Sequence, residues 1–486
     1  RLRAQHPPGA AALARLPGLT RKRIQALHEG LGISSLEDLR DACDAQRVRG
    51  LKGFGAKTEQ RLLAALQARD VEPLADSPIL LRHGLQVAAR LARLLRLAEP
   101  SANIEIAGAC RRREETLDQL DLAVVGGSAS RVLDALERLP GVSALERPAA
   151  RAKLAEGVAL QLHFATPADQ GIGLIHATGP AAHVRALEQR AEQLGSSLDA
   201  TRDEAEVYAR VGLGYVPPEV RDDGSELALA QARSFDDLLT DADLRGVVHC
   251  HTTYSDGKHG IEEMARAAEA QGLDYITITD HSPTAHYARG VTLDRLKQQW
   301  DEIDEVQSRV GIRILRGTES DILADGSLDY PDYILEQLDV VIASIHTRLR
   351  MDRAEMTARL TRTMQLPVYK IWGHALGRLL LTRDPIDCDV EAVLDALAGA
   401  PGAIEINGDP HRLDLPPFWV KRARARGIPF VISADAHSTA GLGMRFGVMM
   451  ARRGGLRRSE VLNTMPAAEF ARRVRPAQGQ VASRES

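Results

Sequence analysis

The stretch Val247-Val248-His249-Cys250-His251-Thr252-Thr253-Tyr254-Ser255-Asp256-Gly257 is the one around which the rest of this sequence is organised. It predicts an apolar strand that ends in two histidines, followed by a loop that carries an aspartate. Because side chains alternate along a strand, His249 and His251 fall on the same face. Two imidazoles and a carboxylate at a strand end favour a metal site. Paired histidines also occur as ordinary hydrogen-bonded residues, so other parts of the chain must decide.

Short apolar strands recur from Leu244 onward, roughly every 25 to 35 residues, with helical patterns between them. They lie near Val247, Ile276, Ile314, Val341, Lys370, Ile404 and Phe430. Seven strand-helix repeats indicate a closed or nearly closed barrel. In such barrels the functional residues lie at the C-terminal ends of the strands.

Polar residues with ligand chemistry gather at these predicted strand ends. The relevant segments are Thr279-Asp280-His281, Gly317-Thr318-Glu319, Ala343-Ser344-Ile345-His346, Trp372-Gly373-His374 and Ser433-Ala434-Asp435-Ala436-His437. Each alone has an ordinary explanation, such as a helix cap for His281 or a satisfied core position for His346. Together, so many imidazoles and carboxylates at successive strand ends are costly to leave unpaired. Bound cations are the simplest compensation.

The chemistry of this set points to phosphoester hydrolysis. Histidine, aspartate and glutamate ligands without sulfur suit Mn²⁺, Zn²⁺ or Fe²⁺. The four cysteines, Cys43, Cys110, Cys250 and Cys388, are far apart and form no thiolate metal site. Metal-bound water can attack phosphorus near neutral pH while another ion stabilises the leaving oxygen. Arg378 and Arg412 could contact a phosphate through their planar donors, or they could be surface arginines.

The front of the chain contains two related segments, each with a glycine turn directly before a basic helix. They are Leu16-Pro17-Gly18-Leu19-Thr20-Arg21-Lys22-Arg23-Ile24 and Leu51-Lys52-Gly53-Phe54-Gly55-Ala56-Lys57-Thr58. Such a turn exposes backbone N–H groups that favour phosphate. The pair resembles tandem helix-hairpin-helix motifs, which bind the DNA backbone without reading sequence. We expect DNA contacts at Gly18, Arg21, Lys22, Gly53, Gly55 and Lys57; two plain helix pairs are the alternative.

A second region, about 77–226, alternates apolar strands with amphipathic helices. Its motifs are Gly108-Ala109-Cys110-Arg111-Arg112-Arg113, Gln119-Leu120-Asp121 and Leu160-Gln161-Leu162-His163. They resemble the nucleotidyltransferase palm of family X DNA polymerases. Two of that family's three metal-binding aspartates are replaced, by Gln119 and Gln161, which leaves Asp121 alone. One carboxylate cannot hold the two Mg²⁺ ions of phosphoryl transfer. We expect a palm that keeps its fold and DNA contacts through Arg111 and Arg112 but lacks polymerase activity.

The residues at the barrel ends carry a further resemblance. The series His249-x-His251, Asp256, His281, Glu319, His346, His374 and Asp435-x-His437 resembles the complete nine-ligand set of the PHP (polymerase and histidinol phosphatase) domain. The domain order resembles that of bacterial family X polymerases with a C-terminal PHP domain. The resemblance implies up to three ions: one held by His249, His251, Glu319 and Asp435, one by Glu319, His346 and His374, and one by Asp256, His281 and His437.

The fold class is therefore expected to be multidomain α/β. We expect a helix-hairpin-helix region at 1–76, a degenerate palm and thumb with α+β structure at 77–226, a linker at 227–243 and a distorted (β/α)7 PHP barrel at 244–486. The resemblance implies a Mn²⁺-dependent 3'-5' exonuclease that processes DNA ends in repair, with abasic-site or 3'-end cleaning as a further option. A small-molecule phosphatase, an active polymerase with exonuclease and a DNA-binding scaffold remain alternatives.

Composition and charge set the broad class. The chain has 486 residues, 44% hydrophobic and 26% charged, which is typical of a globular protein of two to four domains. Residues 1–70 hold 13 Lys and Arg against 7 Asp and Glu, although the whole chain carries −4. A basic front end on an acidic protein favours a polyanion partner. We find no signal peptide or membrane span and expect a cytoplasmic monomer. The chain begins at Arg1, so upstream sequence is expected to be missing.

Overall fold

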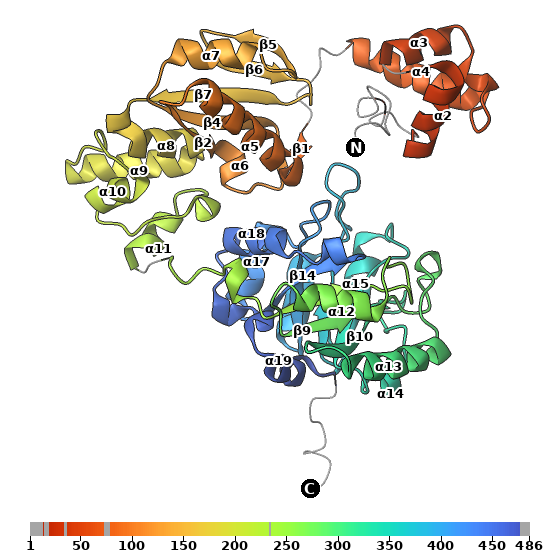
Figure 1. Cartoon of the computed structure of the whole chain (residues 1–486). Coiled ribbons are helices and arrows are strands. Elements are labelled where there is room, and N and C mark those ends of the chain that lie inside the picture. The colour runs from red at the N-terminus through yellow and green to blue at the C-terminus, as the bar shows by residue number, and fades with distance from the viewer. Residues whose placement is uncertain (1–12, 14–18, 34–35, 72–77, 233–234, 477–486) are drawn as a thin grey trace. The chain divides into compact units, whose positions relative to one another are not determined.

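The computed structural model describes residues 13, 19–33, 36–71, 78–232 and 235–476 (Figure 1). Contacts between Cα atoms divide the chain into two compact units, Arg1–Ser77 and Pro78–Ser486. Within the described residues, no helix is both long enough and apolar enough to cross a bilayer.

The first unit is helical. Its elements are α2 (Arg21–Leu31), α3 (Leu36–Asp44), η2 (Val48–Gly50) and α4 (Ala56–Val71). The side chain of Thr20 caps α2 by accepting a hydrogen bond from the backbone N–H of Arg23 at 3.4 Å. The helix ends at Gly32, whose φ of 70° is left-handed and therefore suits glycine. The turn between η2 and α4 contains Gly53 at a φ of 91°. The predicted turn at Gly53 thus precedes a helix, whereas the predicted turn at Gly18 lies outside the described residues.

The second unit begins with a five-stranded sheet of order β2-β4-β7-β6-β5. Its strands are β2 (Asn103–Ala107), β4 (Gln119–Val125), β5 (Val142–Glu146), β6 (Arg151–Leu154) and β7 (Ala159–Ala165). Strands β4 and β7 pair in parallel, and the other pairs are antiparallel. A small antiparallel sheet joins β1 (Ile79–Leu80) to β3 (Thr116–Leu117). The surrounding helices are α5 (Leu81–Ala98), α6 (Gly108–Arg111), α7 (Ala129–Glu137), η3 (Pro167–Asp169) and α8 (Gln170–Thr178).

A helical segment with its own apolar core follows the sheet. Its elements are α9 (Ala181–Leu194), α10 (Glu204–Arg210), η4 (Pro218–Val220) and α11 (Glu226–Ala232). Leu187, Val207 and Tyr208 belong to this core and are fully buried. His183 is buried among them, and its two ring nitrogens lie 2.5 Å from Glu226 and 2.8 Å from the hydroxyl of Tyr208. The buried polar groups of this core are therefore paired.

A closed barrel of seven parallel strands forms the rest of the second unit, in the order β10-β11-β12-β13-β14-β8-β9. The strands are β8 (Gly246–Cys250), β9 (Tyr275–Ile278), β10 (Arg313–Asp321), β11 (Val340–Ser344), β12 (Lys370–Trp372), β13 (Gly402–Asn407) and β14 (Phe430–Ala436). Nearly every strand residue is buried, because helices cover the outside and side chains fill the inside. This closed barrel confirms the predicted seven strand-helix repeats.

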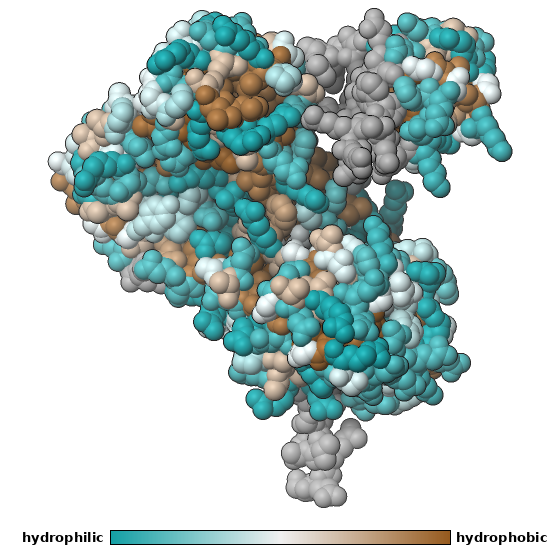
Figure 2. All heavy atoms as spheres, in the orientation of Figure 1, coloured by the Kyte–Doolittle hydropathy of each residue, from teal (hydrophilic) through white to brown (hydrophobic). Residues whose placement is uncertain are grey.

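Helices follow each strand of the barrel in the chain. They are α12 (Ile261–Glu269), α13 (Leu293–Gln307), α14 (Asp332–Leu335), α15 (Arg353–Met364), α16 (Val390–Ala398), α17 (Pro417–Ala425), α18 (Arg445–Arg453) and α19 (Ala467–Val474). The short helical turns are η5 (Asp241–Asp243), η6 (His286–Ala288), η7 (Thr439–Gly441), η8 (Arg458–Glu460) and η9 (Leu462–Thr464). The face of the barrel seen in Figure 2 is mostly hydrophilic, as these amphipathic helices require.

The two ends of the barrel differ. Phe470 of α19 stacks on Tyr275, the first residue of β9, with ring centroids 4.8 Å apart. This apolar contact lies at the N-terminal end of the strands. At the opposite end, the register of β8 shifts between Val247 and Cys250 against β9, and that of β14 shifts between Ser433 and Ala436 against β8. Such irregularities redirect side chains, so the C-terminal end is the one shaped for function.

Candidate metal centre

All nine residues predicted as ligands lie at the C-terminal end of the barrel. His249 lies on β8, His251 and Asp256 follow it, His281 follows β9, Glu319 lies on β10, His346 follows β11, His374 follows β12, and Asp435 lies on β14 with His437 just after it. Seven of the nine are either buried or nearly so; Asp256 and His437 are partly exposed. Residues up to 188 positions apart in the sequence, from His249 to His437, therefore meet at one end of the barrel.

Glu319 is the carboxylate at the centre of the cluster. Its Oε1 lies 2.7 Å from Nε2 of His374 and 3.3 Å from Nε2 of both His249 and His346. Its Oε2 lies 2.9 Å from Nδ1 of His281. A carboxylate that faces four imidazoles from four other strands is placed to bridge ions.

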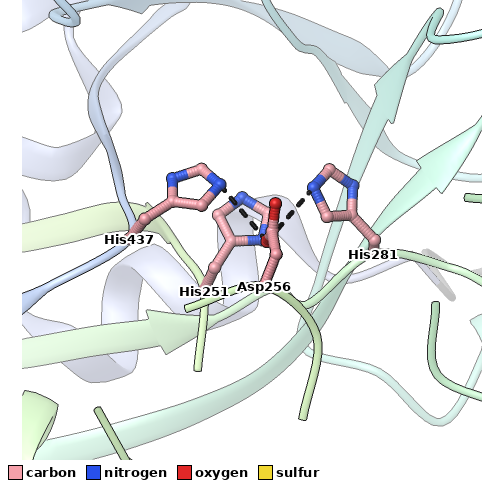
Figure 3. A group of neighbouring side chains, drawn as sticks. All are labelled: His251, Asp256, His281 and His437. Carbon is pink, nitrogen blue, oxygen red and sulfur yellow. Dashed lines mark ion pairs between the residues drawn. The ribbon is translucent and has the colours of Figure 1, made fainter. Parts of the chain in front are cut away.

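Three histidines converge on Asp256, as Figure 3 shows. Its Oδ1 lies 3.3 Å from Nε2 of His437, 3.6 Å from Nε2 of His281 and 3.9 Å from Nδ1 of His251. One potential ligand atom from each of the four residues lies within 4.8 Å of the others. This spacing allows one cation to contact all four.

A third group forms around Asp435. Its Oδ1 lies 3.4 Å from Nε2 of His251 and 3.7 Å from Nε2 of His249. These three residues form one compact set of potential ligands, and His281, Glu319 and His346 form another. His374 joins through its contact with Glu319 rather than as a member of either set.

Buried nitrogen and oxygen atoms in the cluster fit the presence of cations. Nε2 of His249, both ring nitrogens of His251 and Oδ1 of Asp256 are buried without a hydrogen-bond partner among the described residues. Leaving such atoms unsatisfied costs about 1–3 kcal/mol each. A bound cation would satisfy them.

The backbone of the cluster is strained at three of the nine residues. His249, His374 and Asp435 have φ values of 65°, 24° and 48°. Non-glycine residues seldom adopt positive φ, and such strain is concentrated at functional sites. The fold thus holds these side chains in orientations that a regular strand would not give.

The ionisable groups strongly perturb one another. Burial would lower the pKa of His437, but its ion pair with Asp256 and the charge of Asp435 outweigh this effect and raise the pKa to about 9. Burial acts in the same way on His346, whose pKa rises to about 10 because of the charges of Glu319 and Asp321. Burial would raise the pKa of Asp256, yet His437 and its neighbours lower it to about 2. The carboxylates are therefore ionised and ready to bind cations.

Two buried carboxylates beside the cluster were missed from the sequence. Oε1 of Glu405 accepts a hydrogen bond from Nδ1 of His249 at 2.5 Å, and its Oε2 accepts one from the backbone N–H of His374 at 2.5 Å. Oδ1 of Asp321 lies 3.3 Å from Nδ1 of His346. Glu405 lies between two isoleucines of β13 and Asp321 ends β10, and a carboxylate at a strand C-terminal end is the signal that could have revealed both.

The two arginines considered for phosphate contact differ in their surroundings. Arg378 is buried; its Nε donates to the carbonyl oxygen of Arg412 at 2.9 Å, and its Nη2 donates to that of Leu413. Nε of Arg412 lies 3.3 Å from Oδ2 of Asp435, while its Nη1 is buried without a hydrogen-bond partner among the described residues. Arg412 thus has a donor group to offer a ligand beside Asp435.

The predicted DNA-contacting residues of the first unit that the structure describes lie at the start of α2 and around the start of α4. Arg21 is the first residue of α2, and Gly55 directly precedes α4, where Lys57 is the second residue. The side chains of Lys22 and Lys57 are exposed. Gly18 lies outside the described residues.

In the palm, the arginines predicted to contact DNA are used internally. Arg111 makes a two-pronged salt bridge to Glu204, with Nη1–Oε1 and Nη2–Oε2 distances of 2.7 and 2.6 Å. Arg112 donates to Glu114 and to the carbonyl oxygen of Thr178. These residues therefore hold the palm together, and neither guanidinium is fully open to a ligand.

Asp121, the one palm aspartate kept at a predicted metal-binding position, is also hydrogen-bonded within the protein. Its Oδ1 accepts a hydrogen bond from Nε2 of Gln119 at 2.8 Å and lies 2.9 Å from Nε2 of His163. The residue Gln161 donates to the backbone carbonyls of Ala149 and Leu162 at 2.8 and 3.0 Å. Asp121 and Gln161, at two of the positions where the resembling polymerases have metal-binding aspartates, thus make their hydrogen bonds within the protein.

Comparison with known proteins matches two parts of the chain to family models. Residues 248–382 match the PHP domain, and residues 10–68 match the SAM-like helix-hairpin-helix tandem. The PHP domain implies divalent metal ions, in agreement with the geometry above. The helix-hairpin-helix tandem implies DNA binding.

Among whole proteins, the "DNA polymerase/3'-5' exonuclease PolX" of Bacillus subtilis is 33% identical over 485 residues, which span 95% of this chain and 84% of that protein. A "probable phosphatase" of Thermoanaerobacter sp. is 31% identical over 233 residues, or 44% of this chain and 89% of its own length. A solved structure of polymerase beta from Leishmania infantum matches 43% of this chain and 96% of its own at 15% identity and a TM-score of 0.25. The similarity to the Bacillus subtilis protein runs through every domain, and the chain belongs to the PolX family of DNA polymerase/3'-5' exonucleases.

Proposed function

We propose that this chain is a metal-dependent DNA nuclease, a 3'-5' exonuclease that processes DNA ends from its C-terminal barrel. The observation that supports it most strongly is the convergence of nine ligand-type residues, several with buried unpaired atoms, at one end of the barrel. The similarity to a protein named as a 3'-5' exonuclease supports the choice of DNA as the substrate.

We assign the nine residues as ligands of up to three ions. His249, His251, Glu319 and Asp435 would hold one ion, Glu319, His346 and His374 a second, and Asp256, His281 and His437 a third. Imidazole and carboxylate ligands without sulfur suit Mn²⁺, Zn²⁺ or Fe²⁺, and we propose Mn²⁺ because of the similarity to the PHP domain. When bound, such ions supply a reactive water and stabilise negative charge on phosphate oxygens.

The residues of the chain would position the substrate around these ions. The unpaired Nη1 of Arg412 would bind a non-bridging phosphate oxygen beside Asp435. Glu405 would hold the ring of His249 with Nε2 directed toward the cluster. Burial of the centre excludes bulk water and strengthens both interactions.

The remaining domains would deliver DNA rather than copy it. In the helix-hairpin-helix region, assigned to 1–76, exposed Lys22 and Lys57 would contact backbone phosphates. In the degenerate palm and thumb, assigned to 77–226, the carboxylate of Asp121 is hydrogen-bonded to Gln119 and His163. Because it is the one carboxylate left of three, we propose that polymerase activity is lost. A linker at 227–243 would join them to the barrel at 244–486.

Replacing single ligands tests the proposal. His374→Ala and Asp435→Ala should each reduce Mn²⁺-dependent digestion of a 3'-labelled single strand by a factor of about 10³ or more, because each removes a ligand from a shared cluster. His83→Ala, which changes an exposed histidine on α5, is the matched control and should digest normally. Full activity in both ligand variants would refute the assignment.

A phosphatase acting on small molecules is the second candidate, because relatives named as probable phosphatases match the barrel region. A free phosphate monoester should be assayed beside single-stranded, recessed and abasic DNA. Faster hydrolysis of the monoester than of any DNA end would favour the phosphatase.

A further inference from the structure

Tyr287 is an exposed aromatic residue beside the ligand cluster. It lies in η6, and 65% of its surface is exposed. Its ring centroid lies 5.9 Å from that of His281 and 6.0 Å from that of His346. The ring thus contacts two of the nine residues on one side and presents the rest of its surface to solvent. Among the described residues with exposed large apolar side chains, Tyr287 is the one with ring contacts to this cluster.

The loop that carries Tyr287 is firmly held. The flanking residues Ala285 and Ala288 are fully buried. The backbone N–H of Val291 donates to the carbonyl oxygen of His281 at 2.7 Å, which ties the end of the loop to a ligand residue. At Gly290 an added Cβ would lie 2.0 Å from the carbonyl oxygen of Ser282, so the backbone is closely packed. A ring presented by such a loop needs little ordering when a ligand binds.

A cationic group belongs to the same cluster. Nε of Arg412 lies 3.3 Å from Oδ2 of Asp435, and its Nη1 is buried without a hydrogen-bond partner among the described residues. The cluster therefore combines an aromatic face for a base with a donor for a phosphate.

We propose that Tyr287 is a stacking platform for the base of the 3'-terminal nucleotide whose phosphodiester is hydrolysed at the metal centre. This proposal rests on the nuclease function proposed above and specifies how that site takes its substrate. An aromatic face stacks with any base, so the platform selects for the presence of a base and not for its identity. The barrel then prefers nucleic acid ends over phosphate esters that carry no base.

Cleavage of ends with and without a terminal base tests this platform. Tyr287→Ala should lower kcat/KM about 5- to 150-fold on a single strand with a normal 3'-terminal nucleotide, the range expected for loss of one base–aromatic stack. On the same strand ending in an abasic residue, the variant and the original protein should differ by less than about twofold, since there is no base to stack. Tyr287→Phe should behave like the original protein on both.

The controls separate stacking from damage to the site. Tyr333→Ala removes another exposed tyrosine, of 59% exposure, from α14; its ring has no ring contact with the nine residues in the described part of the chain. It should leave both substrates unaffected. Mn²⁺ bound per chain, measured by electron paramagnetic resonance, should be the same in every variant. Equal losses by Tyr287→Ala on both substrates, no loss on either, or a loss in Tyr287→Phe equal to that in Tyr287→Ala would each overturn the proposal.

Photo-crosslinking gives a readout that does not depend on catalysis. A strand ending in 5-iododeoxyuridine is bound to the full chain carrying His374→Ala, which keeps the end intact, and is then irradiated. The crosslinked peptide should contain Tyr287, and a crosslink located elsewhere would overturn the platform. If the original protein digests no DNA, the proposed nuclease function fails, whereas the crosslink still reports separately on the platform.

Discussion

Glu405, a carboxylate outside the nine proposed ligands, is placed to shape the metal centre. Its two carboxylate oxygens accept hydrogen bonds from the ring of His249 and from the backbone of His374, each at 2.5 Å. The first bond fixes which ring nitrogen of His249 carries the proton, and this directs Nε2 to the cluster. Asn407 donates to Glu405 in turn at 3.2 Å. The carboxylate is thus itself held by the strand end.

Replacing Glu405 should weaken metal binding without removing a ligand. Glu405→Ala is expected to raise the Kd for Mn²⁺ about 10- to 100-fold, the usual effect of losing such a supporting carboxylate. Glu405→Gln keeps an acceptor oxygen and should lose less. Titration of Mn²⁺ followed by electron paramagnetic resonance measures both, with His83→Ala as the control. An unchanged Kd in Glu405→Ala would contradict this role.

Metal affinity should rise with pH across the neutral range. The pKa of His437 is raised to about 9 and that of His346 to about 10 in the metal-free protein, so both rings are protonated on both nitrogens and positively charged at pH 7. An ion must displace those protons, and each displaced proton makes binding about tenfold tighter per pH unit below its pKa. The apparent Kd for Mn²⁺ should fall by at least about tenfold per unit from pH 7 to 8 and level off near pH 9 to 10. A flat profile would contradict these pKa shifts.

The same shifts predict the opposite trend for stability without metal. Both histidines have folded-state pKa values above their unfolded value of about 6.5. Their contribution to stability is therefore fully present below pH 6.5 and is lost as pH rises through about 9 to 10. The Tm of chelator-treated protein should fall over this interval more than that of a His437→Ala variant. Equal pH dependence in the two proteins would show that His437 is not the group responsible.

Many residues of the cluster could be predicted from the sequence, because ligand-type residues stand out at the ends of apolar strands. Glu405 and Asp321 escaped prediction because their roles depend on contacts distant in sequence. Glu405 and His249, for example, are 156 residues apart. The positive φ values of His374 and Asp435 have no local signal such as glycine.

Strands β4 and β7 explain why the palm is expected not to copy DNA. They pair in parallel with Asp121 opposite Gln161, so the two positions are neighbours on the sheet. Asp121 is bonded to Gln119 and His163, and Gln161 donates to backbone carbonyls. The polar side chains of Gln119, Asp121 and Gln161 thus find hydrogen-bond partners within the protein.

A primer-extension assay with Mg²⁺ or Mn²⁺ tests directly whether the palm has lost polymerase activity. The original protein should show no templated incorporation of nucleotides. Gln119→Asp should not restore it, because the amide of Gln161 still stands where a further carboxylate is needed and two ions cannot be balanced. The assay should use the His374→Ala background so that digestion does not mask extension. Templated synthesis by the unaltered palm would disprove the loss of polymerase function.

The elements themselves were predictable to different degrees. Alternation of strands and helices predicted seven barrel strands, because buried parallel strands appear as short continuous apolar runs. The motif Gln119-Leu120-Asp121 lies at the start of β4 (Gln119–Val125). The register shifts around Cys250 and Ala436 were not foreseen, since a bulge depends on how two strands meet and not on either strand alone.

Across the whole molecule, we expect the first unit to contribute DNA affinity and the second unit to carry out hydrolysis. The exposed lysines Lys52 and Lys57 flank the turn before α4 in the first unit. The ligand cluster lies entirely in the second unit. A charged front end raises the local concentration of DNA, while the barrel sets the rate of hydrolysis.

Removing both lysines should weaken DNA binding without changing the chemical step. Lys52→Ala with Lys57→Ala should raise the Kd for DNA several-fold and lower the slope of log K against log salt by about 1 to 2, as expected for two lost phosphate contacts. At saturating DNA, kcat should be unchanged. Fluorescence anisotropy over a salt series measures the slope, and Lys297→Ala on α13, also exposed, is the control. An unaltered slope would mean that DNA binds elsewhere.

Closure of the barrel between β8 and β14 has a consequence for synthesis of the protein. The proposed ligands begin with His249 on β8 and end with His437 just after β14, so ribosomes make nearly two hundred residues between the first and the last. Helix-hairpin-helix residues leave the ribosome well before that. A nascent or prematurely terminated chain that stops before β14 lacks Asp435 and His437 and cannot close the barrel. On the proposed assignments, such a fragment should hold DNA but should not cut it, so we expect hydrolysis to begin only when translation is almost complete.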